Sequence, residues 1–530
     1  MMSSDRHVIW IAATLTALGA PLLEAGRQDR PFFRSSTRLV EVSVVVTDRD
    51  RNPVPGLTAG DFQIFDDGKP QKVELFSVEG SSTATPAPPA PPAPPRQARE
   101  FSNKVPDTGS VTIILYDQLN TPIVTSMNAR DHVARFLEQI RPDDRVGLYV
   151  LVGDGSLRVL HDFTSDATSL VRAVSSLRGN VSMALAGEED AARLEAELRD
   201  LFEDSRLTEM GQHFQGLRAV ATIDALESIG RHLSGARNRK NLIWVSAGFP
   251  LGAFGYRGRS RTREITRATR ALNDANVALY TVDARGLIPT LTGVPGNQTF
   301  TTLSMVALNQ DILQSVAEET GGRAFLNTND IQGAVRRAVD DARMTYVLGY
   351  YPTNEVWDGR FHRVEVKVNR PGVEVRHRRG YVAVATQKQA SSERSAALQA
   401  AVASPIGASG LGLTLRIDPV EGRPSAYRLA VHVEPGGIAL EPRGDESRGA
   451  LDVIVAQIRA DGADARRVDR VDISVSGERL QQFLRDGLRI EHTVTLAPEA
   501  ERLRVVVRDD RTGAIGAIGV SRQQLEAIVR

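Results

Sequence analysis

The chain of 530 residues contains no cysteine. Disulfides, thiolate catalysis, cysteine-based zinc fingers and iron–sulfur clusters are therefore excluded. The chain also lacks net charge, because 65 Lys and Arg residues balance 65 Asp and Glu residues. No overall field steers such a protein toward nucleic acid or an acidic surface, and we expect no nucleic-acid partner.

Long apolar runs are equally scarce. The best candidate is Val8–Leu23, which follows Arg6 and is interrupted by Pro21. A spanning helix needs about 20 mainly apolar residues, so this run is too short. A basic start, a short apolar core and small residues after it favour a secretory signal over residues 1–25, with an uncleaved anchor as the alternative. We expect a secreted, periplasmic or cell-envelope protein with no transmembrane segment beyond this signal.

Two segments precede the main body of the chain. A β-branched run and the Asp67-Gly68 turn between apolar stretches predict an N-terminal β unit over residues 34–79. Residues 80–107 are rich in Pro and Ala, which predicts an extended, semi-rigid linker.

From residue 108 to residue 351 the pattern alternates between apolar strands and segments with helical spacing. This alternation predicts a parallel sheet with helices on both faces, and the turn at Asp154-Gly155 adds one antiparallel edge. A charged helical insertion is expected at about 181–215. The predicted strands are Val111–Tyr116, Val146–Val152, Leu157–Leu160, Leu242–Ser246, Val277–Val282 and Tyr346–Tyr351.

The remainder of the chain returns to strand patterns. Residues 352–384 alternate around Pro371-Gly372 and predict a β-hairpin extension, and residues 385–405 read as a small-residue linker. Residues 406–530 predict a β-sandwich-like domain. Its expected strands are Leu413–Ile417, Tyr427–Val433, Leu451–Ile458, Val468–Val475, Ile490–Leu496 and Leu503–Asp509.

Several motifs resemble a known family. VTIILYDQLNT, RVGLYVLVGDGSLRVLHDFTSD, RKNLIWVSAGFP and VALYTVDARGL follow the lead-in VSVVVTDRDRNPVPGLTAGDFQIFDDGKPQKVELFSVE in this order. Together they resemble the acidobacterial-type proteins related to the von Willebrand factor type A (vWA) domain, over roughly residues 36–385 without the linker and the insertion. The resemblance implies a doubly wound, mostly parallel, Rossmann-like sheet and an exported protein, but little about mechanism.

In such domains a hard cation usually sits at the carboxyl edge of the sheet. Its ligands are the Asp, Ser and Ser of D-x-S-x-S, a Thr from a later loop and an Asp after the fourth strand, and a partner's carboxylate completes the shell. Here Asp117 and Thr121 match, but Leu119 replaces the middle Ser and Ala247 stands at the late Asp position. Leu177–Asn180 offers no Thr.

We therefore expect no complete metal site and no cofactor. The alternative is a weak, degenerate site for Mg²⁺ or another divalent cation at Asp117 and Thr121, with help from Asn120 or Ser246. The structural interpretation is that Asp117 forms a hydrogen-bonded cap on the strand-to-helix turn.

The sequence motifs give little support to the hypothesis that this protein is an enzyme. Ser246 faintly resembles a nucleophile elbow, but Trp244 breaks the pattern G-x-S-x-G. The nine His residues show no metal-ligand spacing. Asp283 and Arg285 predict either a pair that fixes a loop or an Arg that contacts ligand.

We expect a non-catalytic module that binds a protein or cell-surface ligand. Ligands of open α/β sheets bind outside the carboxyl ends of the strands. A divalent-cation-dependent adhesion module and a structural envelope scaffold are the alternatives. The expected ligand-binding edge consists of Asp117, Asn120, Thr121, Ser246, Asp283 and Arg285.

Overall fold

The computed structural model describes residues 39–529 except for 81–98, 106–110, 178–204, 237–238, 250–258, 288–296, 342, 354–359, 384–390 and 463. The expected signal, most of the Pro/Ala-rich linker and most of the charged insertion lie outside the described residues. None of the described helices is long and apolar enough to cross a membrane.

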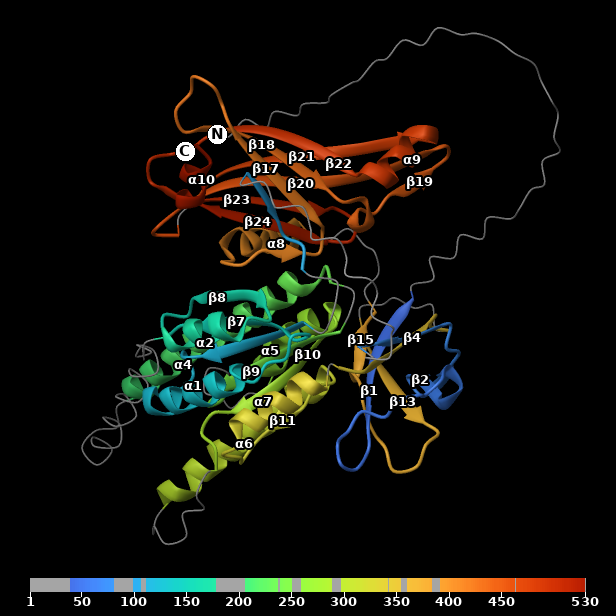
Figure 1. Ribbon diagram of the computed structural model, residues 1–530, viewed down its shortest axis with the longest axis vertical. Helices are drawn as coiled ribbons and strands as arrows, with labels where there is room; N and C mark the ends of the chain where they lie inside the picture. The colour runs from blue at the N-terminus through green and yellow to red at the C-terminus, as the bar shows by residue number, and fades with distance from the viewer. Residues whose placement is uncertain are drawn as a thin grey trace, which may run out of the picture. The chain divides into compact units, whose positions relative to one another are not determined.

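The centre of the chain forms the mostly parallel sheet that the sequence predicts (Figure 1). Its strands lie in the order β11-β10-β9-β6-β7-β8, and only β7 and β8 pair antiparallel. Numbered along the domain, this is the order 3-2-1-4-5-6 of a doubly wound sheet. The strands are β6 (Val111–Asp117), β7 (Arg145–Leu151), β8 (Leu157–Thr164), β9 (Lys240–Ser246), β10 (Val277–Asp283) and β11 (Ala324–Phe325).

Helices cover this sheet on both faces. Successive strand residues point to opposite faces, so Ile113 and Leu115 pack with α4, α5 and α6 whereas Ile114 and Tyr116 pack with α1, α2 and α7. Burial on both faces explains the uninterrupted apolar strands in the sequence. The helices are α1 (Ile123–Leu137), α2 (Ala167–Ser175), α4 (Ser205–Leu233), α5 (Arg259–Asp274), α6 (Asn297–Glu319) and α7 (Ile331–Asp340).

A separate β body combines residues from before and after the central domain. Its two four-stranded sheets are β14-β1-β12-β4 and β15-β13-β2-β3, and they share one apolar core. The elements are β1 (Val40–Thr47), η1 (Ala59–Asp61), β2 (Phe62–Asp66), β3 (Lys69–Gln71), β4 (Leu75–Glu79), β12 (Thr345–Tyr350), β13 (Phe361–Val368), β14 (Glu374–Arg376) and β15 (Gly380–Val382).

The position of β12 corrects the expectation that this strand completes the α/β series. It pairs antiparallel with β1 and β4 instead, with Val42 opposite Leu348. Tyr346, Leu348 and Tyr350 are buried together with alternate residues of β1. The expected N-terminal unit and hairpin extension are thus two halves of one core.

The C-terminal region contains two sheets that share a second apolar core. One has the order β16-β24-β23-β20-β19, with β21 paired to β20, and the other has the order β22-β18-β17-β5. Strand β5 (Glu100–Ser102) comes from the end of the expected linker. The other elements are β16 (Ala408–Ser409), β17 (Leu413–Pro419), β18 (Ala426–Val433), η3 (Pro435–Gly437), β19 (Glu441–Arg443), β20 (Glu446–Arg459), β21 (Asp464–Ser476), α9 (Gly477–Asp486), β22 (Leu488–Thr495), β23 (Ala500–Asp509), β24 (Ile515–Ser521) and α10 (Arg522–Val529).

The second expected linker, at 385–405, is wrong over most of its length, because Ser391–Ala403 forms helix α8. Alanine is the strongest helix former, so a run of small residues here favours a helix. Leu398, Ala401 and Val402 are buried against the outer face of β20 and β23. The buried Arg504 donates from Nε to the carbonyl of Ala401 (2.7 Å), and burial lowers its pKa to about 9.

The docking of α8 gives a testable consequence. Leu398→Ala should lower the free energy of unfolding by about 2–5 kcal/mol, because it removes a buried side chain and leaves a cavity. Leu484→Ala is the matched control on α9, where the leucine is exposed, and it should change stability by no more than about 0.5 kcal/mol. Urea unfolding followed by circular dichroism measures both, and equal effects would contradict a packed α8.

Candidate functional site at the carboxyl edge of the central sheet

Asp117 ends strand β6, and its carboxylate is enclosed by hydrogen-bond donors. Oδ2 accepts from Trp244 Nε1 (3.0 Å) and from Ser246 Oγ (2.8 Å). Asn120 donates twice, from its backbone N to Oδ1 and from Nδ2 to Oδ2, both at 2.9 Å. Only 1% of Asp117 is exposed. A buried carboxylate is tolerated because these donors replace the water it has lost.

The loop after β6 is tied to its surroundings by two further side chains. Asn120 Nδ2 also donates to Thr222 Oγ1 on α4 (2.8 Å). Thr121 Oγ1 accepts from the backbone N of Ala247, after β9 (3.0 Å). The loop therefore bridges a strand and a helix that are distant in sequence, and it holds Asp117 in place from both sides.

Asp283 and Arg285 lie at the same edge and form their own pair. Arg285 donates from Nε to Oδ1 (2.9 Å) and from Nη2 to Oδ2 (2.8 Å), and its backbone N also donates to Oδ1. Asp283 stands opposite Ser246 in the register of β10 and β9. The structure thus brings all six expected residues to one edge, and the arginine is engaged with its own loop.

Burial controls the electrostatics of the site. It raises the pKa of Asp117, against the hydrogen bonds from Asn120, Ser246 and Trp244, which lower that pKa. Asp283 is fully buried as well. The carboxylate oxygens of Asp117 and Asp283 accept hydrogen bonds from donors within the protein.

The residues present do not fit a hard cation at Asp117. A tryptophan N–H can only donate, so the oxygen that accepts from Trp244 faces a hydrogen and not a cation. Leu119, at the middle position of the motif, is buried and offers no oxygen. The hydroxyl of Thr121 already accepts from Ala247. A cation would have to displace several hydrogen bonds and would gain at most two ligand side chains of the five that the family pattern uses.

Two residues that hold this site together, Trp244 and Thr222, were not predicted from the sequence. Trp244 was considered only because it breaks a hydrolase motif, and Thr222 was not considered. The spacing of Trp244 and Ser246 carried a usable signal, because residues two apart in a strand point to the same face. Thr222 gave no such signal, since its position depends on how α4 packs.

Among the described residues of this edge, the side chains exposed at the start of α1 are apolar. Asn120, Thr121 and Ser246 are buried. Ile123, Val124 and Met127, in the first turns of α1, are 40%, 69% and 47% exposed. Residues three and four apart in a helix are neighbours, so these three form one surface, which we call the α1 patch.

No protein-family model and no curated protein matches the chain. Among solved structures, it is similar to an aerotolerance-related membrane protein from Bacteroides fragilis (15% identity, 44% of this chain and 98% of that chain, TM-score 0.25). It is also similar to BatB from Bacteroides thetaiotaomicron (14% identity, 44% and 98%, TM-score 0.23). A third is the ArnB paralog VWA2 from Sulfolobus acidocaldarius (10% identity, 91% and 74%, TM-score 0.23).

The fold assignment rests on the strand order of the central sheet. That order, with its single antiparallel edge strand, is the one expected of the Rossmann-like sheet that the vWA motifs imply. The central domain therefore has the doubly wound, mostly parallel fold that the sequence predicts.

The buried carboxylate predicts a particular pH dependence for Asp117→Asn. The folded protein holds the Asp117 proton more tightly than the unfolded chain does. The stability contributed by the protonated group is thus present below about pH 3.8 and is lost as the pH rises through the raised pKa. The unfolding free energy of the wild type, minus that of the variant, should therefore fall as the pH rises above about 3.8, by no more than about 1.4 kcal/mol per pH unit.

Asp154→Asn is the matched control for this measurement, made by urea unfolding at each pH. At Asp154 a burial penalty, which raises the pKa, is outweighed by hydrogen bonds from Ser156 and Arg158, so the pKa is lowered. The unfolding free energy of the wild type, minus that of Asp154→Asn, should be flat above about pH 3.8 and should fall only at lower pH, as the Asp154 carboxylate becomes protonated. A flat difference for Asp117→Asn would contradict the raised pKa.

Proposed function

We propose that this protein is a non-catalytic binding module of the cell envelope that captures a protein ligand at the carboxyl edge of its vWA-like sheet without a metal ion. The observation that carries the proposal is the division of this edge into a closed polar interior around Asp117 and an exposed α1 patch.

The α1 patch supports direct protein contact. Exposed, contiguous apolar side chains on an otherwise polar surface mark interaction sites. Ile123, Val124 and Met127 follow directly on the loop that Asp117 and Thr121 immobilise, so the patch begins on a fixed backbone. Rigid presentation lowers the entropy lost when a partner binds.

The enclosed carboxylate supports a metal-free mode. In a cation-dependent domain, Asp117 would offer its oxygens to the ion, and the ion would recruit an acidic ligand. Here Trp244 and Ser246 use the same oxygen. The ligand is therefore expected to be apolar at its centre rather than acidic.

Export to the envelope rests on the N-terminal sequence. Val8–Leu23 has the length and flanks of a secretory signal. A structural envelope scaffold remains the second candidate. It is favoured by the C-terminal pair of sheets, which gives the chain a further large body in addition to the vWA-like domain.

Site-specific photocrosslinking tests the binding surface. A benzophenone amino acid at Val124 should give a discrete adduct in cells that produce the full chain, with or without a chelator. Val468, on β21, is the matched control, because it is also exposed (58%) but lies outside the patch. Met127→Glu should abolish the adduct, since it places a charge in the apolar contact. Equal labelling from both positions, or no adduct from Val124, would contradict the proposal.

Calorimetric titration tests the metal-free mode. Mg²⁺ and Ca²⁺ should give no saturable heat with the full chain, and Asp117→Ala should behave in the same way. Saturable Mg²⁺ binding that disappears in the variant would overturn this part of the proposal and restore the cation-dependent alternative.

A further inference from the structure

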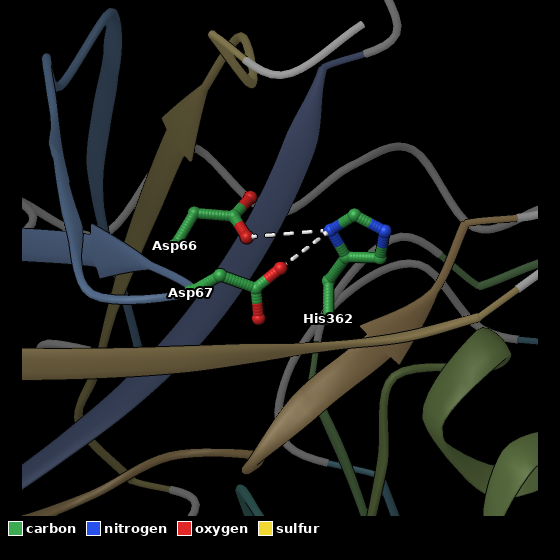
Figure 2. Close-up of side chains that lie close together, drawn as sticks. All are labelled: Asp66, Asp67 and His362. Carbon is green, nitrogen blue, oxygen red and sulfur yellow. Dashed lines mark ion pairs between the residues drawn. The ribbon is translucent and has the colours of Figure 1, made fainter. Parts of the chain in front are cut away.

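A second group of chemically active side chains lies in the β body, far from Asp117 in sequence. Asp66 ends β2, Asp67 begins the following turn, and His362 lies near the start of β13. Figure 2 shows both carboxylates facing the same ring nitrogen, His362 Nδ1. That nitrogen is 3.0 Å from Asp67 Oδ2 and 3.7 Å from Asp66 Oδ1.

The turn explains how neighbouring residues reach one point. Consecutive residues in a strand point to opposite faces, so two adjacent aspartates in β2 would diverge. Asp67 instead has φ +48° and Gly68 has φ +78°, the left-handed pair of a tight two-residue hairpin turn. The turn brings the Asp67 carboxylate around to the side on which Asp66 already lies.

The remaining oxygen of each carboxylate is held by the protein. Tyr350 and Tyr381 both donate their hydroxyls to Asp66 Oδ2, each at 2.9 Å. The backbone N of Arg363 donates to Asp67 Oδ1 at 2.8 Å. These donors orient Asp66 Oδ1 and Asp67 Oδ2 toward the imidazole. Outer donors of this kind commonly fix the carboxylate ligands of metal sites.

The charges in this group do not balance. Two carboxylates face one imidazole, and within the described ranges no Lys or Arg forms an ion pair with either aspartate. The side chains of Asp66 and His362 are only 4% and 7% exposed. In a buried setting this excess of negative charge favours a bound cation.

We propose that Asp66, Asp67 and His362 bind a divalent first-row transition ion, with Zn²⁺ and Co²⁺ as probes. The three ligand atoms lie within 4.8 Å of one another. With bonds of about 2.0–2.2 Å to nitrogen and oxygen, neighbouring ligands of one ion lie about 3.0–3.5 Å apart. The observed 3.0 Å and 3.7 Å approach this spacing and need only small side-chain adjustments.

The ligand set also indicates which ions are excluded. Imidazole nitrogen suits Zn²⁺ and its neighbours, whereas Mg²⁺ and Ca²⁺ prefer an all-oxygen shell. The side chain of Asp67 is 45% exposed, so water can complete the coordination from that side. The ion would join β2 to β13, segments separated by almost 300 residues of sequence.

The first experiment is calorimetric titration of the metal-free full chain with Zn²⁺, followed by Co²⁺ absorption. One saturable site should appear, and excess Mg²⁺ should not compete. Asp67→Asn should weaken the affinity at least about tenfold, because it removes a charged ligand from an exposed turn. Asp50→Asn is the matched control, an exposed aspartate in another turn of the same β body, and should keep the wild-type affinity.

Tyr381→Phe provides an independent variant that leaves all three ligands in place. It should weaken Zn²⁺ binding about 10–100-fold through the loss of one donor to Asp66, with circular dichroism confirming a folded chain. Bound Zn²⁺ should raise the melting temperature of the wild type and not that of Asp67→Asn.

Two results would overturn the site. One is the absence of saturable Zn²⁺ binding by the folded wild type, which would leave an ion-paired histidine. The other is binding that Asp67→Asn and Tyr381→Phe leave unchanged. Asp117→Ala should retain Zn²⁺ binding, so this outcome is separate from that of the vWA-like edge.

Discussion

The carboxylate of Asp117 is the constraint on which the centre of this protein depends. It lies at the end of a central strand of a sheet buried on both faces, where an unsatisfied charge would cost several kcal/mol. The protein meets this cost with an indole N–H, a hydroxyl and an amide from three different positions. Each of these donors in turn fixes the element that carries it, so one buried charge sets the geometry of the entire edge.

The same buried carboxylate distinguishes two possible roles for this edge, which are cation binding and the fixing of a loop. A carboxylate that serves a cation must keep its oxygens open, whereas a carboxylate that organises a loop must fill them. Trp244 settles the matter for Oδ2, because an indole cannot act as a ligand. What faces solvent is then the start of α1, whose apolar residues owe their position to the immobilised loop. The proposed metal-free mode and the proposed apolar contact surface would both follow from this one local arrangement.

The sequence predicts the strands of the central sheet well and the pairing of the outer strands poorly. Strands such as β6 and β9 are covered on both faces, and two-sided burial leaves a continuous apolar run that is easy to read. Strand β12 has a similar run, yet it belongs to another body, because apolarity reports burial and not the partner. Helix α8 was not predicted, because its many alanines do not alternate clearly between apolar and polar residues and so show no amphipathic face.

At the site, the six expected residues do lie at one edge, but the role of Trp244 depends on a contact across two strands that spacing alone does not reveal.

In the β body, the fold brings together reactive side chains that form no motif in the linear sequence. Its halves lie on either side of the central domain in the sequence, so Asp66 and His362 meet only after a loop of almost 300 residues has closed. Closing so long a flexible loop costs about (3/2)RT ln n, and a folded central domain removes most of that cost by bringing its own ends into reach. The core of Val42, Leu348 and their neighbours then holds the two halves together. A cluster formed at this junction exists only in the completed fold, so any ion that it binds stabilises that fold against the open chain.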